Sequence, residues 1–129
     1  MYTVMVAEDS YMQRQLIAKL LQSHEFNVLT VKDGVEALEQ LQTTPLDLIV
    51  LDVEMPKLNG YEVCRRLKAD PRLRKLPVIF CSSNNTQVGR YWGIKLGAAA
   101  YVSKPFQPQD FLETLNNVLR PAKQPTICR

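Results

Sequence analysis

The sequence contains few of the residues that build metal centres and disulfide frameworks. It has one histidine, His24, and three cysteines, Cys64, Cys81 and Cys128, which show no metal-ligand spacing. An odd number of cysteines excludes a fully paired disulfide framework. Cys64 and Cys81 lie within apolar patterns typical of small core residues. This cysteine usage predicts a reducing, cytoplasmic environment.

Long hydrophobic runs and an N-terminal targeting pattern are also absent. No apolar run approaches the roughly 20 residues needed to span a bilayer, and the strand-like start of the chain lacks the basic and apolar regions of a signal peptide. With 129 residues, of which 46% are hydrophobic, the chain can bury a core of its own. We expect one domain over residues 1–120 and a flexible tail over residues 121–129, which show no periodicity.

A strong excess of positive charge is lacking as well. The net charge is +3, but residues 1–119 hold 13 Lys or Arg and 13 Asp or Glu, so the excess comes from the last ten residues. A nucleic-acid-binding domain would carry a basic stripe on a folded face. The nearest candidate is interpreted as a solvated helix end and loop, and it consists of Arg65, Arg66, Lys68, Arg72, Arg74 and Lys75. We therefore expect no nucleic-acid partner.

Segments typical of strands and helices alternate five times, which predicts an α/β fold with a parallel sheet. Residues 47–51 and 77–81 are apolar at nearly every position, so helices should cover both faces of the sheet. The fourth helix, roughly 86–96, should end at Gly97, and the fifth should begin at Pro108. Two helix starts carry capping signals, namely Ser10 with Gln13 and Asp33 with Glu36, and Asn59-Gly60 closes a loop that begins at Pro56.

Four of the apolar segments stop at reactive polar residues. These residues are Glu8 and Asp9, Asp52, Ser82, and Lys104. Because the carboxyl ends of parallel strands line one crevice, we expect these side chains to meet at one edge of the sheet. Two like charges about 4 Å apart repel by roughly 4 kcal/mol at an effective dielectric near 20, which a divalent cation would offset. Carboxylate oxygens with no His or Cys nearby favour Mg²⁺.

An acidic cluster that holds a metal ion beside a lysine and a hydroxyl is suited to phosphoryl transfer, which depends mainly on positioning and electrostatic stabilisation. Asp52 can act as the nucleophile and form an aspartyl phosphate. Lys104 would then neutralise one phosphoryl oxygen, and Ser82 would donate a hydrogen bond to another.

The chain resembles a response-regulator receiver domain of the single-domain, chemotaxis-regulator (CheY-like) type over residues 3–119. The matching features are Glu8-Asp9, Asp52 within the stretch Leu51 to Pro56, Gly60, Ser82, and the stretch Gly97 to Phe106. The resemblance implies a flavodoxin-like, doubly wound sheet of five parallel strands in the order 2-1-3-4-5, with five helices.

The resemblance also implies a role for each matching residue. Asp52 is implied as the phospho-acceptor, and Glu8, Asp9, Asp52 and the backbone carbonyl of Glu54 are implied as the Mg²⁺ ligands. The implied phosphate contacts and switch residues are Lys104, which precedes a cis Pro105, together with Ser82 and Tyr101. Glu54 and Asn84 occupy positions that tune the rate of dephosphorylation in this family.

The implied function is that of a signalling switch rather than an enzyme. A sensor histidine kinase would phosphorylate Asp52, and the domain itself would catalyse phosphotransfer and dephosphorylation. We expect no output module in this protein, and therefore phosphorylation-dependent binding of an effector protein at the face of the fourth helix, fifth strand and fifth helix. Trp92, in the fourth helix, is expected in the core. The stretch Arg90 to Gly93 is similar to receivers of pilus-motility and phototaxis systems, and chemotaxis is a further possibility.

Three other classes of function remain as alternatives. An Asp-nucleophile phosphatase would need a second aspartate two residues after the nucleophile, where this chain has Glu54. A flavin carrier would need a Gly/Ser/Thr-rich loop after the first strand, where Glu8 and Asp9 would repel phosphate. A degenerate receiver that acts only as a scaffold would not need an intact acidic cluster. Turnover of a free phosphate ester would favour the phosphatase. A bound yellow chromophore would favour the flavin carrier, and failure to be phosphorylated would favour the scaffold.

Overall fold

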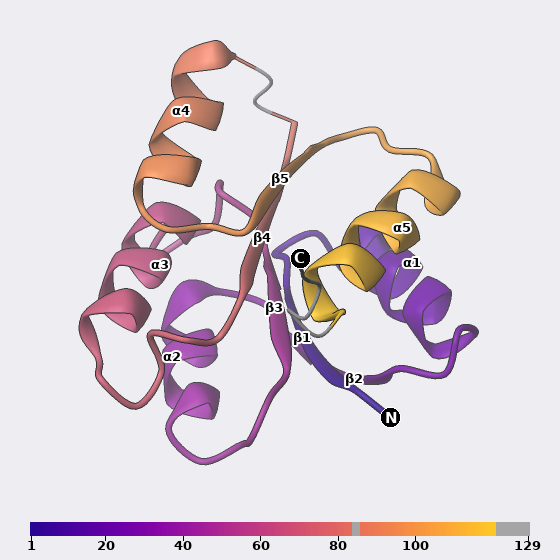
Figure 1. The fold of residues 1–129 in the computed structure, drawn as a ribbon, viewed down its shortest axis with the longest axis horizontal. Coiled ribbons are helices and arrows are strands. Elements are labelled where there is room, and N and C mark those ends of the chain that lie inside the picture. The colour runs from indigo at the N-terminus through magenta and orange to yellow at the C-terminus, as the bar shows by residue number, and fades with distance from the viewer. Residues whose placement is uncertain (84–85, 121–129) are drawn as a thin grey trace, which may run out of the picture.

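Five short apolar segments form one parallel sheet in the order β2-β1-β3-β4-β5 (Figure 1). The structure is a computed structural model that describes residues 1–83 and 86–120. The strands are β1 (Thr3–Ala7), β2 (Asn27–Val31), β3 (Leu48–Leu51), β4 (Val78–Ser82) and β5 (Ala100–Ser103). Every residue of β3 and β4 is buried, as expected for central strands covered on both faces. The predicted fold class and strand order are confirmed.

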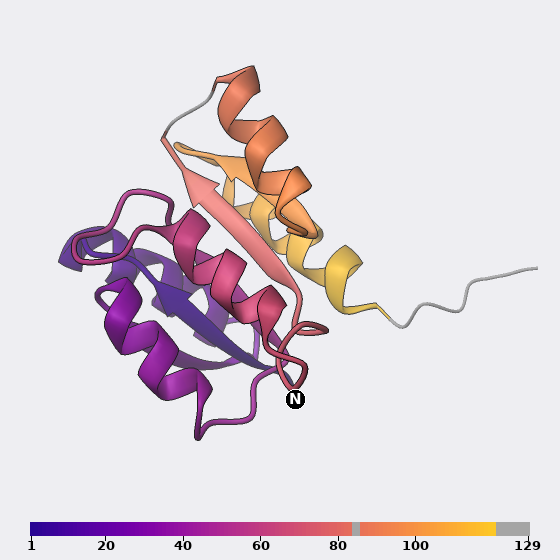
Figure 2. The same ribbon diagram turned by 90° about the vertical axis from the view of Figure 1, so that its left-hand side faces the viewer.

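Five helices cover the two faces of the sheet. They are α1 (Tyr11–Gln22), α2 (Gly34–Leu41), α3 (Gly60–Ala69), α4 (Gln87–Lys95) and α5 (Pro108–Leu119). The helices α2, α3 and α4 lie on one face, whereas α1 and α5 lie on the other (Figures 1 and 2). Each face has its own apolar layer, one around Phe80 and Leu67 and the other around Phe111 and Leu21.

The helices α1, α2 and α3 begin after residues whose side chains cap the first turn, two of which, Ser10 and Asp33, were predicted from the sequence. The side chains of Ser10, Asp33 and Asn59 each accept a hydrogen bond from the backbone N–H three residues further on. Gly97 has a φ of +102° just beyond α4, a backbone conformation that favours glycine. Pro108 is the first residue of α5, as predicted.

One prediction about the core is wrong. Trp92 was expected inside, but its exposed fraction is 52%. The reason is that α4 turns its two glycines, Gly89 and Gly93, toward the sheet. A Cβ atom on Gly93 would lie 2.9 Å from Cδ2 of Tyr101, so a larger residue would not fit there. Trp92 therefore belongs to the solvent-facing side of α4, together with Val88, Tyr91 and Ile94.

The remaining sequence predictions about burial agree with the structure where it describes the residues concerned. Cys64 and Cys81 are buried and carry free thiols. Most of the basic cluster is exposed at the end of α3 and in the loop that follows it. None of the described helices has the length and apolar character to cross a membrane. Asn84 and the predicted tail 121–129 lie outside the described residues.

Candidate functional site

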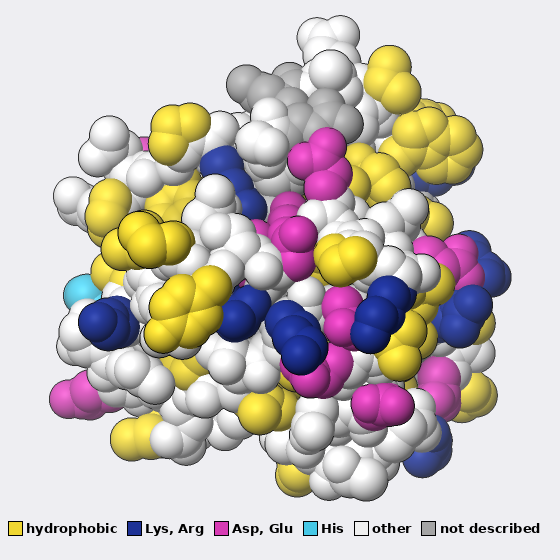
Figure 3. All heavy atoms as spheres, turned by 180° about the vertical axis from the view of Figure 1, so that it is seen from behind, with side chains coloured by type: hydrophobic (Ala, Val, Ile, Leu, Met, Phe, Trp, Pro, Cys, Tyr) yellow, Lys and Arg dark blue, Asp and Glu magenta, His cyan; other side chains and the backbone are white. Residues whose placement is uncertain are grey.

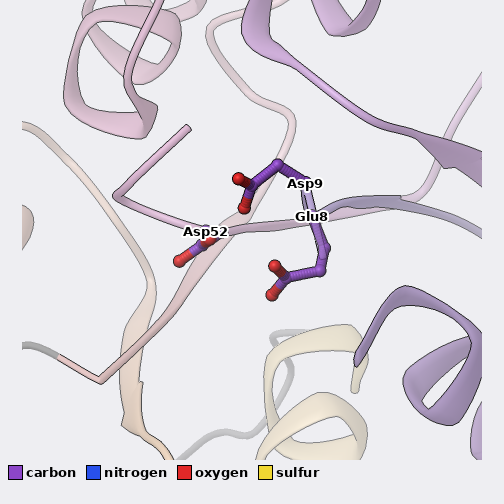
Figure 4. Close-up of side chains that lie close together, drawn as sticks. All are labelled: Glu8, Asp9 and Asp52. Carbon is purple, nitrogen blue, oxygen red and sulfur yellow. The ribbon is translucent and has the colours of Figure 1, made fainter. Parts of the chain in front are cut away.

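Three carboxylates meet at the carboxyl ends of β1 and β3, the two central neighbours in the sheet. Ala7 at the end of β1 pairs with Leu51 at the end of β3, so the next residues, Glu8 and Asp52, lie side by side at the same edge of the sheet. One carboxylate oxygen from each of Glu8, Asp9 and Asp52 lies within 4.8 Å of the others (Figure 4). Glu8 and Asp52 are buried, with exposed fractions of 3% and 6%, whereas Asp9 is exposed.

The backbone around the acidic residues is fixed by hydrogen bonds from neighbouring elements. The N–H of Asp52 donates to the carbonyl of Ala7 at 2.9 Å, and the N–H of Glu8 donates to the carbonyl of Val31 at 3.1 Å. The guanidinium of Arg14, in α1, donates to the carbonyl of Glu8 at 2.8 Å. The turn from β1 into α1 is therefore tied to both β2 and α1, which holds the acidic residues in place.

Lys104 reaches this cluster from the loop after β5. Its Nζ forms an ion pair with Glu8, lies 3.7 Å from Oδ1 of Asp52, and donates to Oε1 of Gln13 at 2.6 Å. Its backbone N–H donates to the carbonyl of Ser82 at 2.9 Å, which ties the loop to β4. The peptide bond between Lys104 and Pro105 is cis, as the family resemblance implied.

The surroundings of Asp52 make its ionised form unfavourable. Burial and the negative charge of Glu8 raise the pKa of Asp52 to about 7, although the positive charge of Lys104 and a backbone hydrogen bond from Glu54 act in the opposite direction. Burial lowers the pKa of Lys104, but its hydrogen bond to Glu8 and the charges of Asp52 and Glu8 outweigh this, so its pKa is raised. Lys104 thus stays cationic at neutral pH.

The donor set fits a divalent cation of the Mg²⁺ type. With all groups ionised, the three carboxylates and one ammonium leave an uncompensated negative charge at a partly buried position. The candidate ligands are all hard carboxylate oxygens, which Mg²⁺ prefers, and the cluster contains neither His nor Cys. A bound cation would favour the ionised form of Asp52 and so lower its pKa.

Ser82 and Tyr101, the predicted switch residues, lie on the adjacent strands β4 and β5. Ser82 ends β4, is fully buried, and pairs in register with Ser103 of β5. Tyr101 is only 8% exposed. Its ring lies 6.0 Å from that of Phe80. The ring of Tyr101 therefore occupies a buried position next to Phe80.

Arg90 of α4 contacts both the ring and the backbone of Tyr101. The guanidinium carbon lies 5.1 Å from the centre of the Tyr101 ring, within the range of a cation–π contact. Its nitrogens donate to the hydroxyl of Ser103 at 2.9 Å and to the carbonyl of Tyr101 at 3.5 Å. Arg90 thereby links α4 to β5 at the position of the predicted switch tyrosine.

The structure thus brings together Glu8, Asp9, Asp52 and Lys104, and it places Ser82 and Tyr101 on the adjacent strands. Glu54 is exposed, and its backbone hydrogen bond to Asp52 connects it with the site. The sequence alone did not indicate that Gln13, Arg14 and Arg90 belong to the site. Gln13 was interpreted only as a capping residue, and Arg90 only as part of a similarity in α4.

An apolar groove lies beside the acidic cluster, between α1 and the loop that follows β5. It has a volume of about 800 Å³, and its lining residues include Leu16, Ile17, Leu20, Lys104, Pro105 and Phe106. Leu16 belongs to an exposed apolar surface at the start of α1 that also includes Tyr11 and Met12. Exposed apolar side chains on both sides of a band of charged residues are visible from behind (Figure 3).

Comparisons with known proteins identify the family of the chain. The family model described as the response regulator receiver domain matches residues 4–116. The chain is 36% identical over 118 residues to a probable transcriptional regulator, ycf29, of Pyropia yezoensis, and the match covers 92% of this chain and 53% of that protein. This chain therefore spans about half the length of that relative.

Two solved structures show the same architecture. The chemotaxis protein CheY4 of Vibrio cholerae is 31% identical, with a TM-score of 0.87 over 92% of this chain and 99% of that chain. The receiver domain of the sensor histidine kinase PA1611 from Pseudomonas aeruginosa is 26% identical, with a TM-score of 0.86 over 93% of this chain and 98% of that chain. In that receiver domain a magnesium ion is coordinated in the active-site cleft.

Proposed function

The chain belongs to the response regulator receiver domain family, and we propose that Asp52 accepts a phosphoryl group from a sensor histidine kinase in the presence of Mg²⁺. Receiver domains are the signalling components of two-component systems, in which they interact with sensor kinases and downstream effectors. The observation that carries the proposal is the position of Asp52 between two further carboxylates and the Lys104 ammonium.

Glu8, Asp9, Asp52 and the backbone carbonyl of Glu54 are the proposed Mg²⁺ ligands. The bound ion would supply positive charge that neutralises the carboxylates and the oxygens of the incoming phosphoryl group. The donor set supports this assignment, as does the magnesium ion in the cleft of the PA1611 receiver domain.

In the proposed reaction a carboxylate oxygen of Asp52 attacks phosphorus. The O–P bond to Asp52 forms as the N–P bond to the donor histidine breaks, and the imidazole nitrogen keeps the electron pair of that bond. Lys104 is charged at neutral pH and lies 3.7 Å from Asp52, so its ammonium can donate to a phosphoryl oxygen. The hydroxyl of Ser82 is the proposed second donor. The same residues would support self-catalysed dephosphorylation.

The donor is proposed to be another protein because an apolar surface adjoins the site. Leu16 and Lys104 both line the groove between α1 and the loop after β5, and Tyr11 and Met12 are exposed at the start of α1. Exposed apolar side chains that adjoin a charged site are typical of a protein-binding surface. We therefore expect the phosphodonor histidine to reach Asp52 from this side.

The effector protein is proposed to bind at the face formed by α4, β5 and α5. A phosphoryl group adds nearly two negative charges and three strong acceptor oxygens next to Ser82 and Lys104. Movement of these side chains would change the packing around Tyr101 and thereby the position of α4, whose exposed Val88, Tyr91, Trp92 and Ile94 would contact the effector. Chemotaxis, pilus motility and phototaxis remain the predicted processes.

The proposed domain comprises residues 1–120, and the proposed location is the cytoplasm. Among the residues that the structure describes, the ten elements lie between Thr3 and Leu119. The buried free thiols of Cys64 and Cys81 are compatible with a reducing environment.

Incubation with Mg²⁺ and acetyl phosphate, followed by intact mass spectrometry, tests the proposed function. The wild-type chain should gain the mass of one phosphoryl group, and Asp52→Asn should gain none. The matched control is Asp110→Asn, which makes the same change at an exposed position in α5 and should be phosphorylated like wild type. Full phosphorylation of Asp52→Asn would refute the assignment of Asp52 as the phospho-acceptor. No phosphorylation of wild type would favour a domain that acts only as a scaffold.

A further inference from the structure

Gln13 lies in the first turn of α1, where its side chain is not used to cap the helix. A capping box would direct this side chain back to the backbone N–H of Ser10. Only one half of that motif forms, because Oγ of Ser10 accepts the N–H of Gln13 at 3.3 Å. The N–H of Ser10 donates instead to Oε2 of Glu8 at 3.0 Å. Glu8 thus takes the place of Gln13 as the acceptor of the Ser10 N–H in the capping box. The amide group of Gln13 can therefore contact another residue.

That residue is Lys104, which lies 91 positions further along the chain. Nζ of Lys104 donates to Oε1 of Gln13 at 2.6 Å and also pairs with Glu8. An ammonium group has three N–H donors. Two of them are directed to Gln13 and Glu8 on the β1 and α1 side of the site. The third N–H can point toward Asp52, whose Oδ1 lies 3.7 Å from Nζ.

We propose that Gln13 is a positioning residue that holds the Lys104 ammonium in reach of the phosphoryl group on Asp52. This inference rests on the proposed function. The flexible four-carbon stem of a lysine does not fix its ammonium without partners. Glu8 alone would be an unreliable anchor because it is also a proposed ligand of the metal ion, which would share its negative charge. The amide oxygen of Gln13 orients the ammonium without adding a fourth negative charge to the site.

The substitution Gln13→Met tests this role because methionine has a similar length and helix propensity but lacks the amide acceptor. We expect the rate of phosphorylation by acetyl phosphate and Mg²⁺ to fall about 3- to 10-fold, the effect of losing one hydrogen bond to a charged donor. Gln15→Met is the matched control, since residue 15 lies about 200° around the helix from residue 13. Its phosphorylation rate should equal that of wild type.

A double-mutant comparison separates positioning of Lys104 from a general effect on α1. In a Lys104→Met chain, the additional change Gln13→Met should not lower the phosphorylation rate further, because its only route of action is gone. An equal loss in both backgrounds would show that Gln13 acts independently of Lys104 and would overturn the proposal. A Gln13→Met chain with the wild-type rate would overturn it as well.

A measurement without phosphorylation keeps this test distinct from that of the proposed function. In ¹⁵N-lysine-labelled protein, the Lys104 ammonium protons should exchange slowly with water, and Lys104→Arg identifies their signal. Gln13→Met should accelerate this exchange several-fold, whereas Gln15→Met should not change it. Unchanged exchange in Gln13→Met would overturn the positioning role. A wild-type chain that gains no phosphate would refute the proposed function, and the exchange rate would still decide the role of Gln13.

Discussion

Replacing Asp52 by Asn should stabilise the metal-free fold at neutral and higher pH. Burial and the charge of Glu8 raise the pKa of Asp52 to about 7 in the folded chain, whereas an aspartate in an unfolded chain has a pKa of about 3.9. Between these two pH values the folded state binds a proton that the unfolded state has released. Stability therefore falls as the pH rises through this window, and it stays low above about pH 7. Asparagine has nearly the same shape and carries no charge.

The size of the effect follows from the pKa difference. One pKa unit corresponds to about 1.4 kcal/mol, so a shift from about 3.9 to about 7 sets an upper bound of roughly 4 kcal/mol. Water and side-chain relaxation reduce this figure, and we expect Asp52→Asn to raise the free energy of unfolding at pH 8 by about 1 to 3 kcal/mol. For a chain of this length, the midpoint of thermal unfolding should rise by roughly 3 to 12 °C.

Urea and thermal unfolding at pH 5 and pH 8, in the presence of a chelator, measure this prediction. The stability difference between Asp52→Asn and wild type should shrink at pH 5 to about one third of its value at pH 8. Added Mg²⁺ should stabilise wild type more than the variant, which lacks one ligand. The control Asp110→Asn should stay within about 0.5 kcal/mol of wild type throughout. A variant that is less stable than wild type at pH 8 without metal would refute the reasoning.

Three further substitutions test other parts of the site. Lys104→Met should slow phosphorylation of Asp52 by about 10- to 100-fold, measured by intact mass, because a phosphoryl oxygen loses its ammonium partner. Gly93→Ala should lower the free energy of unfolding by roughly 1 to 2 kcal/mol, measured with urea; the added Cβ would lie 2.9 Å from Cδ2 of Tyr101. Arg90→Met should increase the nitration of Tyr101 by tetranitromethane several-fold, measured by peptide mass spectrometry, because the ring loses its cation–π contact and becomes more accessible.

Each of these predictions has a result that contradicts it. Phosphorylation of Lys104→Met at the wild-type rate would exclude a role for the ammonium. A Gly93→Ala chain as stable as wild type would show that α4 can move away from the sheet at no cost. For the nitration experiment, Lys95→Met is the control, because Lys95 contacts the ring of Tyr91 at 5.7 Å rather than that of Tyr101. Equal nitration of Tyr101 in wild type and Arg90→Met would exclude the proposed protection.

The sequence predicts the central strands and helix ends well because local rules determine them. The unbroken apolar runs of β3 and β4 indicate burial on both faces, and both strands are fully buried. Ser10 and Asp33 mark helix starts because their side chains accept a backbone hydrogen bond in the first turn. The strand order did not follow from these patterns. It required the family resemblance, because no local signal states which strands are neighbours.

The carboxylate cluster was predictable for a related reason. Glu8 and Asp52 directly follow buried strands, and neighbouring parallel strands end at one edge. The exposure of Trp92 was not predicted because the size of an aromatic residue suggested the core. The better signal was the spacing of Gly89 and Gly93, which places two small residues on one face of α4. The contact between Gln13 and Lys104 could not be predicted, since it depends on a distant loop returning to α1.

The most direct test of the account is the chemical location of the phosphoryl group. After phosphorylation by acetyl phosphate and Mg²⁺, reduction with borohydride converts an aspartyl phosphate to homoserine, and peptide mass spectrometry then identifies the position. The account predicts homoserine at residue 52, and no such product when a chelator removes Mg²⁺. Modification of Asp9 in place of Asp52, or equal modification of Asp52 without the metal, would contradict it.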